Sequence, residues 1–178
     1  MKAGGILTKS QNRFATTVIL IIISGFLYGV ETFIPRPVPF IRLGLGNVLV
    51  LFALINLGTK EGFQVGIGKS IVGALLTGSF LSPSLILSLS GTISSIIIMW
   101  TLYTTGFFGI IGLSMAGAVT NGVVQAIVVS CFFAGTYAFA YVGRIMAMSG
   151  LITGCITGFI TYGLLKFIER RSGGTEHK

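Results

Sequence analysis

The chain is 178 residues long, has a mean hydropathy of +0.95 and a formal net charge of +8, and only 9% of its residues are charged. A soluble domain carries about 25% charged residues, so the composition excludes an ordinary soluble protein. Apolar runs approach the roughly 20 residues that a helix needs to span a bilayer. They do not alternate as the strands of a membrane β-barrel do. We therefore expect an all-α polytopic membrane protein, folded as a single transmembrane domain over residues 1–178.

Six apolar segments are predicted to cross the membrane as a six-helix bundle. Their approximate ranges are 14–34, 43–57, 63–80, 85–103, 110–134 and 144–168. The first lacks a small-x-small cleavage site, so we interpret it as a retained span and not as a signal peptide. Residues 135–143 are interpreted as an aromatic-rich link. Cys131 and Cys155 lie in apolar segments and are interpreted as packing residues.

Basic residues gather in two tails, at about 1–12 and 169–178. Cytoplasmic segments of membrane proteins are enriched in Lys and Arg, and six spans place both tails on one side. We therefore predict that both termini and the turn at Lys60 are cytoplasmic. We therefore attribute the positive net charge to membrane topology and do not expect the protein to bind nucleic acid.

A proline-rich stretch separates the first two expected spans, with prolines at alternate positions in 35–39. Proline fixes φ and lacks an N–H, so we expect a stiff extended loop on the outer side. Arg36 and Arg42 lie in it and Glu31 lies just before it, while Arg144 begins the sixth span at the same side. Positive charge there opposes the orientation rule, which makes these residues candidate ligand groups. Ordinary snorkelling at the interface is the alternative.

Polar side chains also occur inside the expected spans. Asn121 and Gln125 share one helix face because they are four residues apart, and Asn47 lies among glycines at the outer end of the second span. Instead of binding a ligand, these amides could pack helices together through interhelical hydrogen bonds, each of which contributes about 0.6 kcal/mol. Lys69 is ionisable and intramembrane, which marks a candidate functional site, although it lies nearer the inner side and far from Glu31. With four glutamates and no aspartate in the chain, an anionic ligand is one way to balance the cations.

The sequence matches no enzymatic or nucleotide-binding motif well. The segment Gly66–Ser70 ends like a phosphate-binding loop, but the required first glycine is replaced by Phe63 and no strand precedes it. The only histidine is His177 in the tail, and no metal-ligand cluster is evident. We expect no enzyme, no metal and no cofactor. On the first span, Gly25 and Gly29 form a small-x-x-x-small face that could dock a membrane partner or pack internally.

The segment Arg42–Asn47 resembles the heptaprenyl diphosphate synthase component I family, also called Gx transporters. Further matches are Glu31, Lys69, the Ser-Leu-Ser-Gly segment at 88–91, and Gly117 with Asn121 and Gln125. The family often has His where this chain has Thr120, which removes one candidate ligand group. The family is similar to the S-components of energy-coupling-factor transporters. That resemblance implies a six-helix fold, a ligand held under the first outer loop, and a transmembrane coupling subunit with ATPases.

Residues and resemblance together predict a substrate-binding or transport subunit in a bacterial inner membrane, in contact with the lipid bilayer. Its ligand is expected to be small and anionic, captured from the outer face. The expected site residues are Arg42, Asn47, Asn121, Gln125 and Arg144, with Arg36, Glu31 and Lys69. The alternative is a non-catalytic membrane subunit of isoprenoid or quinone biosynthesis, or of an associated redox system. Autonomous prenyl transfer is not expected, because such enzymes hold Mg²⁺ with aspartates and hard cations need oxygen ligands.

Overall fold

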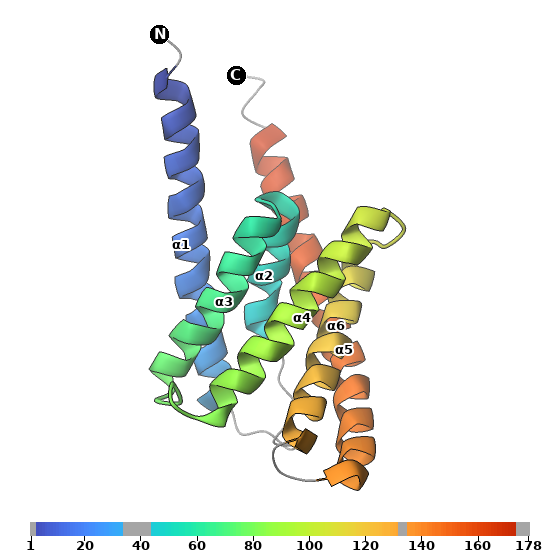
Figure 1. Cartoon of the computed structure of the whole chain (residues 1–178). Coiled ribbons are helices and arrows are strands. Elements are labelled where there is room, and N and C mark those ends of the chain that lie inside the picture. The colour runs from blue at the N-terminus through green and yellow to red at the C-terminus, as the bar shows by residue number, and fades with distance from the viewer. Residues whose placement is uncertain (1–2, 34–43, 132–134, 174–178) are drawn as a thin grey trace.

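The computed structural model describes residues 3–33, 44–131 and 135–173, and over these ranges it is built from six helices and contains no strand. This confirms the prediction of an all-helical bundle (Figure 1). In chain order the helices are α1 (Ala3–Phe33), α2 (Leu45–Asn56), α3 (Thr59–Leu76), α4 (Pro83–Thr105), α5 (Ile110–Val129) and α6 (Gly135–Gly173).

Four of the six helices are long and apolar enough to cross a membrane, namely α1, α4, α5 and α6. The other two helices of the predicted six-helix bundle, α2 and α3, do not meet both criteria. Helix α2 has 12 residues, which gives only about 18 Å of helix against a hydrocarbon core of about 30 Å. Helix α3 is long enough but carries three charged residues, Lys60, Glu61 and Lys69.

Two helices extend further than the sequence patterns indicated. Helix α1 starts at Ala3 and not near residue 14, so most of the basic N-terminal segment is helical. Helix α6 begins at Gly135, so the residues interpreted as a link belong to its first turns. No proline interrupts either segment, and Lys, Gln and Arg are good helix formers, so the helices continue beyond their apolar parts.

Helix α2 occupies the centre of the bundle. It packs against α1, α3, α4 and α6, while the other helices are neighbours in the order α1, α3, α4, α5, α6. The run 50–54 is fully or almost fully buried and forms the main hydrophobic core with Leu20, Val65, Ile96 and Leu113. A short helix can lie at the centre because its neighbours shield it from lipid.

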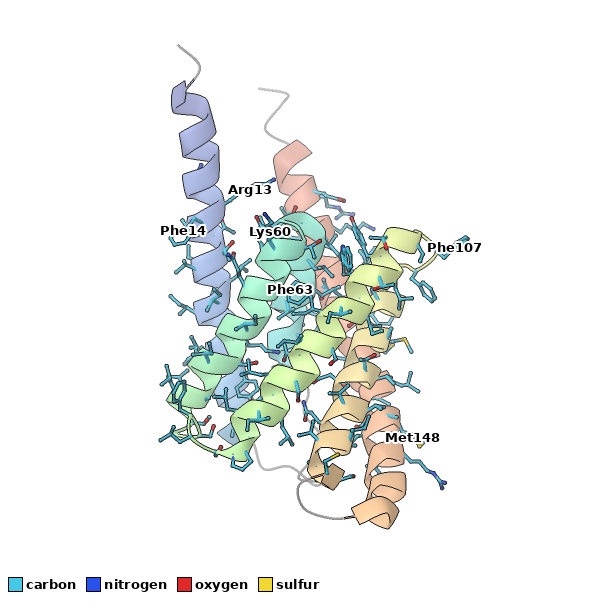
Figure 2. All side chains as sticks on the ribbon, viewed as in Figure 1. Arg13, Phe14, Lys60, Phe63, Phe107 and Met148 are labelled. Carbon is cyan, nitrogen blue, oxygen red and sulfur yellow. The ribbon has the colours of Figure 1, made fainter. Side chains whose placement is uncertain are left out.

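The bundle has two distinct ends. Helix α1 begins and α6 ends at the same end, which we call the terminal end (Figure 1). Lys60 in the first turn of α3 and Phe107 of the α4–α5 turn lie there as well (Figure 2). Arg13 and Glu61 approach to 3.9 Å at this end, but the arginine is half-exposed, so the pair contributes little to stability. The shared end agrees with the predicted placement of both tails on one side.

Glycines allow α1 and α3 to approach closely. A Cβ added at Gly25 would lie 2.5 Å from the Val72 side chain, and one at Gly73 would lie 2.1 Å from the Tyr28 ring. A Cβ added at Gly29 would lie 3.5 Å from the Leu76 side chain, which is an ordinary van der Waals contact. The close contact at Gly25 agrees with the internal-packing alternative for this glycine, whereas docking of a membrane partner through the pair stays a prediction.

Candidate functional site

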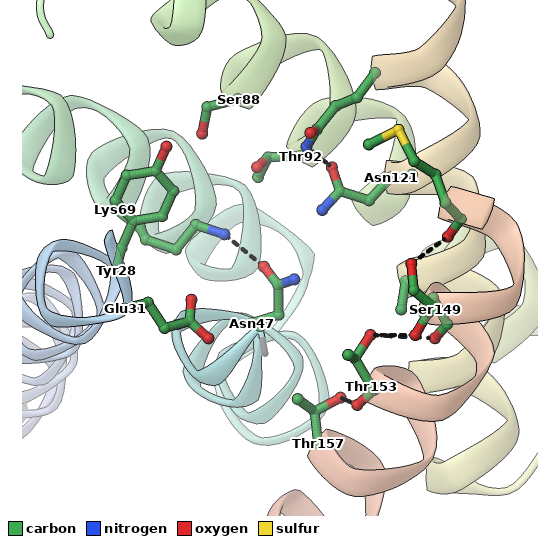
Figure 3. Close-up of a pocket in the computed structure, with 17 residues that line it drawn as sticks. Tyr28, Glu31, Asn47, Lys69, Ser88, Thr92, Asn121, Ser149, Thr153 and Thr157 are labelled. Carbon is green, nitrogen blue, oxygen red and sulfur yellow. Dashed lines mark hydrogen bonds between the residues drawn. The ribbon is translucent and has the colours of Figure 1, made fainter. Parts of the chain in front are cut away.

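A polar cavity of about 60 Å³ lies inside the bundle and is lined from all six helices. It lies towards the end opposite the terminal end, beside the last turn of α1, the first turns of α2 and the last turns of α5. Among the lining residues that the structure describes, only two besides the glycines lack a polar side chain, Ala118 and Met146. The polar lining residues are Tyr28, Glu31, Asn47, Lys69, Ser88, Thr92, Asn121, Gln125, Ser149, Thr153 and Thr157 (Figure 3).

The cavity exists because α2 is short and starts inside the bundle. Its N-cap is Gly44 at φ 75°, a left-handed conformation that glycine adopts without strain. A Cβ at Gly46 would lie 2.9 Å from Cδ of Lys69 and 3.0 Å from the backbone oxygen of Ser24. Glycine at position 46 therefore leaves the room through which the lysine stem passes.

Lys69 lies on the α3 side of this cavity and is only 3% exposed. Its Nζ donates a hydrogen bond to Oδ1 of Asn47 at 2.5 Å. An ammonium group placed inside a membrane bundle is expensive unless it is hydrogen-bonded or paired. Lys69, which we expect among the site residues although nearer the inner side, lines the same cavity as Asn47 and Asn121.

Glu31 at the end of α1 also lines the cavity and is 4% exposed. Its Oε1 accepts a hydrogen bond from the backbone N–H of Leu45 at 2.9 Å. Leu45 is the first residue of α2, where free N–H groups and the helix dipole favour a negative charge. The sequence had suggested that Glu31 and Lys69 lie far apart, whereas the structure brings both side chains to one cavity.

The predicted pairing of Asn121 and Gln125 on one helix face is present in the structure. Nε2 of Gln125 donates to Oδ1 of Asn121 at 2.9 Å. Helix α4 has Gly91 opposite this pair, where an added Cβ would lie 2.1 Å from Oδ1 of Asn121 and 3.0 Å from Nε2 of Gln125. Gly91 thus provides the space that the amide pair occupies.

Sequence reasoning missed the hydroxyl side chains of the site. Ser149, Thr153 and Thr157 line the cavity from α6, and Thr157 shares a 2.7 Å hydrogen bond with Ser114 of α5. Their spacing of four residues places them on one helix face, and this spacing is the signal that could have identified them. On α4, Ser88 donates to Oγ of Ser70 at 3.1 Å.

Of the three arginines expected at the site, the structure describes only Arg144. Arg144 is exposed and does not line the cavity, so the expected contribution of this residue is not supported by its placement. Arg36 and Arg42 lie outside the described residues. Among the described lining residues, Lys69 and Glu31 are the charged groups.

The side chains that line the site are mainly hydrogen-bonding groups. Among the described residues, no group of three or more His, Cys, Asp or Glu side chains could hold a metal ion. The lining offers amides, hydroxyls, one ammonium group and one carboxylate, which can orient a small polar molecule.

Fold and site together define a helical membrane protein with a small, polar, internal binding cavity. The chain belongs to the heptaprenyl diphosphate synthase component I family, whose model matches residues 20–164. This confirms the family resemblance seen in the sequence. Neither the curated proteins nor the solved structures gave a match to the chain, so the likeness to S-components stays a prediction.

Proposed function

We propose that this protein is a non-catalytic membrane subunit that binds a small anionic ligand in the Lys69 cavity and acts with a partner protein. The observation that carries the proposal is the nearly complete burial of Lys69 among hydrogen-bonding side chains inside a membrane bundle. Ionisable residues within membrane segments are rare, and they commonly mark binding sites or transport pathways. Packing of the bundle alone does not require a charged residue at this position.

The family description suggests the partner. A component I implies at least one further component of the synthase, and the present chain lacks aspartate altogether. Because the Mg²⁺-diphosphate chemistry of prenyl transfer needs carboxylate ligands, we assign catalysis to the partner. In this proposal the chain supplies a membrane site next to the enzyme that elongates the lipid product.

The partner assignment is tested by purifying the tagged protein from its native membranes after mild crosslinking. We expect a prenyl diphosphate synthase subunit to be enriched, and we expect its activity in vesicles to rise when the present chain is added back. Unchanged synthase activity and no enrichment of that subunit would contradict the assignment.

Uptake of a solute is the second candidate, and the position of the cavity favours it. The cavity lies towards the end opposite the termini, which the basic tails predict to be the outer side. A site nearer the outer side suits capture of a solute from that side by a transport subunit. The energy-coupling partner with ATPases predicted from the resemblance belongs to this candidate.

Mass spectrometry of small molecules that copurify with the protein tests the ligand assignment. We expect a small anion in the wild-type sample, and its loss in Lys69→Met, which keeps the stem volume but removes the charge. Lys60→Met is the matched control, because Lys60 is exposed at the terminal end. Equal amounts of the anion in both variants would place the ligand elsewhere.

A further inference from the structure

The amide pair of α5 leaves hydrogen-bonding capacity unused. The hydrogen bond from Gln125 to Asn121 takes one donor hydrogen and one acceptor lone pair, whereas each primary amide offers two donor hydrogens and two lone pairs. In the described part of the chain, no buried side-chain nitrogen or oxygen lacks a partner. The remaining amide atoms, Nδ2 of Asn121 and Oε1 of Gln125, are therefore accessible from the cavity that both residues line.

This pair offers a donor and an acceptor whichever way its amides are turned. Turning both amides over would make Asn121 the donor and Gln125 the acceptor of their mutual bond. One oxygen and one nitrogen would still be left for a ligand. A neighbouring donor and acceptor recognise a complementary edge, as amide side chains do when they bind the N6 and N7 atoms of adenine.

We infer that the ligand carries a neutral amide-type edge, with one N–H donor and one C=O acceptor, that binds Asn121 and Gln125, while its anionic group lies near Lys69. The inference rests on the proposed anion binding and specifies the other half of the ligand. Asn121 and Lys69 come from different helices and lie on different sides of the cavity in Figure 3. A ligand in the cavity can therefore contact both groups with its two ends.

Volume and polarity limit the ligand to a compact molecule without a hydrocarbon chain. A water molecule needs roughly 10–15 Å³ of cavity volume on the same kind of scale, so the 60 Å³ cavity holds only a few non-hydrogen atoms. Among the described lining residues other than glycines, only Ala118 and Met146 are apolar, so a prenyl chain beside them would leave buried polar groups without hydrogen-bond partners. The chain of a polyprenyl diphosphate is therefore excluded from this cavity.

Oxamate and pyruvate are suitable probes, because they have the same number of non-hydrogen atoms and the same carboxylate. Oxamate carries a carboxamide, whereas pyruvate carries a methyl ketone and so lacks the N–H donor. The binding of each to the full-length protein in detergent is followed through the shift of its thermal denaturation midpoint with probe concentration. We expect oxamate to bind about tenfold more tightly than pyruvate, the effect of one additional hydrogen bond.

Two variants separate the two halves of the site. Gln125→Met removes one amide at similar length and should abolish the preference for oxamate over pyruvate. Lys69→Met should weaken both probes equally. If Gln125→Met does not fold, the ratio of the two wild-type affinities still decides the inference.

The outcomes distinguish this inference from the function on which it rests. Equal binding of oxamate and pyruvate by the wild type, with both lost in Lys69→Met, would overturn the amide edge but keep anion binding. Failure of both probes to bind would overturn anion binding and with it the inference. A preference for oxamate that survives in Gln125→Met would also overturn it.

Discussion

Glu31 and Leu45 connect the end of α1 to the start of α2, since the Glu31 carboxylate accepts a hydrogen bond from the Leu45 backbone N–H at 2.9 Å. The two residues are separated by the whole proline-rich stretch of the sequence. The carboxylate therefore fixes the position at which the central helix begins, and with it the position of the cavity that Asn47 lines two residues later.

Replacing Glu31 should lower the stability of the protein by an amount that depends on what the new side chain retains of the carboxylate. A hydrogen bond to a charged group contributes about 1.5–3 kcal/mol, so Glu31→Ala should lower the midpoint of thermal denaturation in detergent clearly. Glu31→Gln keeps an acceptor oxygen but loses the charge that interacts with the helix dipole, so it should lie between Ala and wild type. Glu169→Ala is the control, because Glu169 is exposed. Equal midpoints for Glu31→Ala and Glu169→Ala would show that the cap is dispensable.

The two glycines of the first span should respond differently to the same substitution. At Gly25 an added methyl group would meet Val72 at 2.5 Å, whereas at Gly29 it would meet Leu76 at 3.5 Å. Overpacking costs about 1–3 kcal/mol, so Gly25→Ala should destabilise the isolated protein and Gly29→Ala should not. Denaturation midpoints of the two variants in the same detergent measure this difference. A Gly25→Ala variant that is as stable as wild type but fails to bind a partner would restore the docking interpretation.

The orientation of the bundle is tested by single cysteines at its two ends. Lys60 is exposed at the terminal end, and Leu81, between α3 and α4, is 97% exposed at the other. In a background in which Ser replaces Cys131 and Cys155, Leu81→Cys should react with an impermeant thiol reagent added to intact cells, whereas Lys60→Cys should react only after lysis. The opposite pattern of labelling would reverse the predicted topology and place the cavity near the cytoplasmic side.

The sequence was sufficient for those features that depend on local composition. Hydropathy and glycine or proline turns predicted six helices, and the spacing of Asn121 and Gln125 predicted their shared face. The boundaries were less accurate, because α1 and α6 continue into polar or aromatic segments that contain no proline to end a helix. Periodicity reports which residues a helix prefers to bury, but not where its hydrogen bonding ends.

Three-dimensional relationships between helices were the part that sequence could not supply. Lys69 was assigned to the inner half because α3 was treated as a full span aligned with the others. In the structure, the short α2 begins inside the bundle, so Asn47 lies deep enough to accept a hydrogen bond from Lys69. The pairing of Gly91 with Asn121 depends on the contact between α4 and α5, which no spacing within one helix reveals.

Gly91 provides the last prediction, since it determines whether the amide pair can form. A methyl group at this position would overlap Oδ1 of Asn121 at 2.1 Å and approach the Asn121 backbone oxygen at 3.1 Å. Gly91→Ala must therefore displace the Asn121 side chain or separate α4 from α5, at about 1–3 kcal/mol. We expect a lower denaturation midpoint together with loss of the preference for oxamate over pyruvate.

The matched control is Gly163→Ala in α6, where an added Cβ meets no atom within 4 Å. Because alanine favours helix over glycine by up to about 1 kcal/mol, this variant should be as stable as wild type or slightly more so, with its binding unchanged. A Gly91→Ala variant that is destabilised but keeps the full oxamate preference would show that the pair is not what the ligand contacts. If Gly91→Ala loses both stability and preference while Gly163→Ala loses neither, the selectivity depends on the space that Gly91 leaves for Asn121.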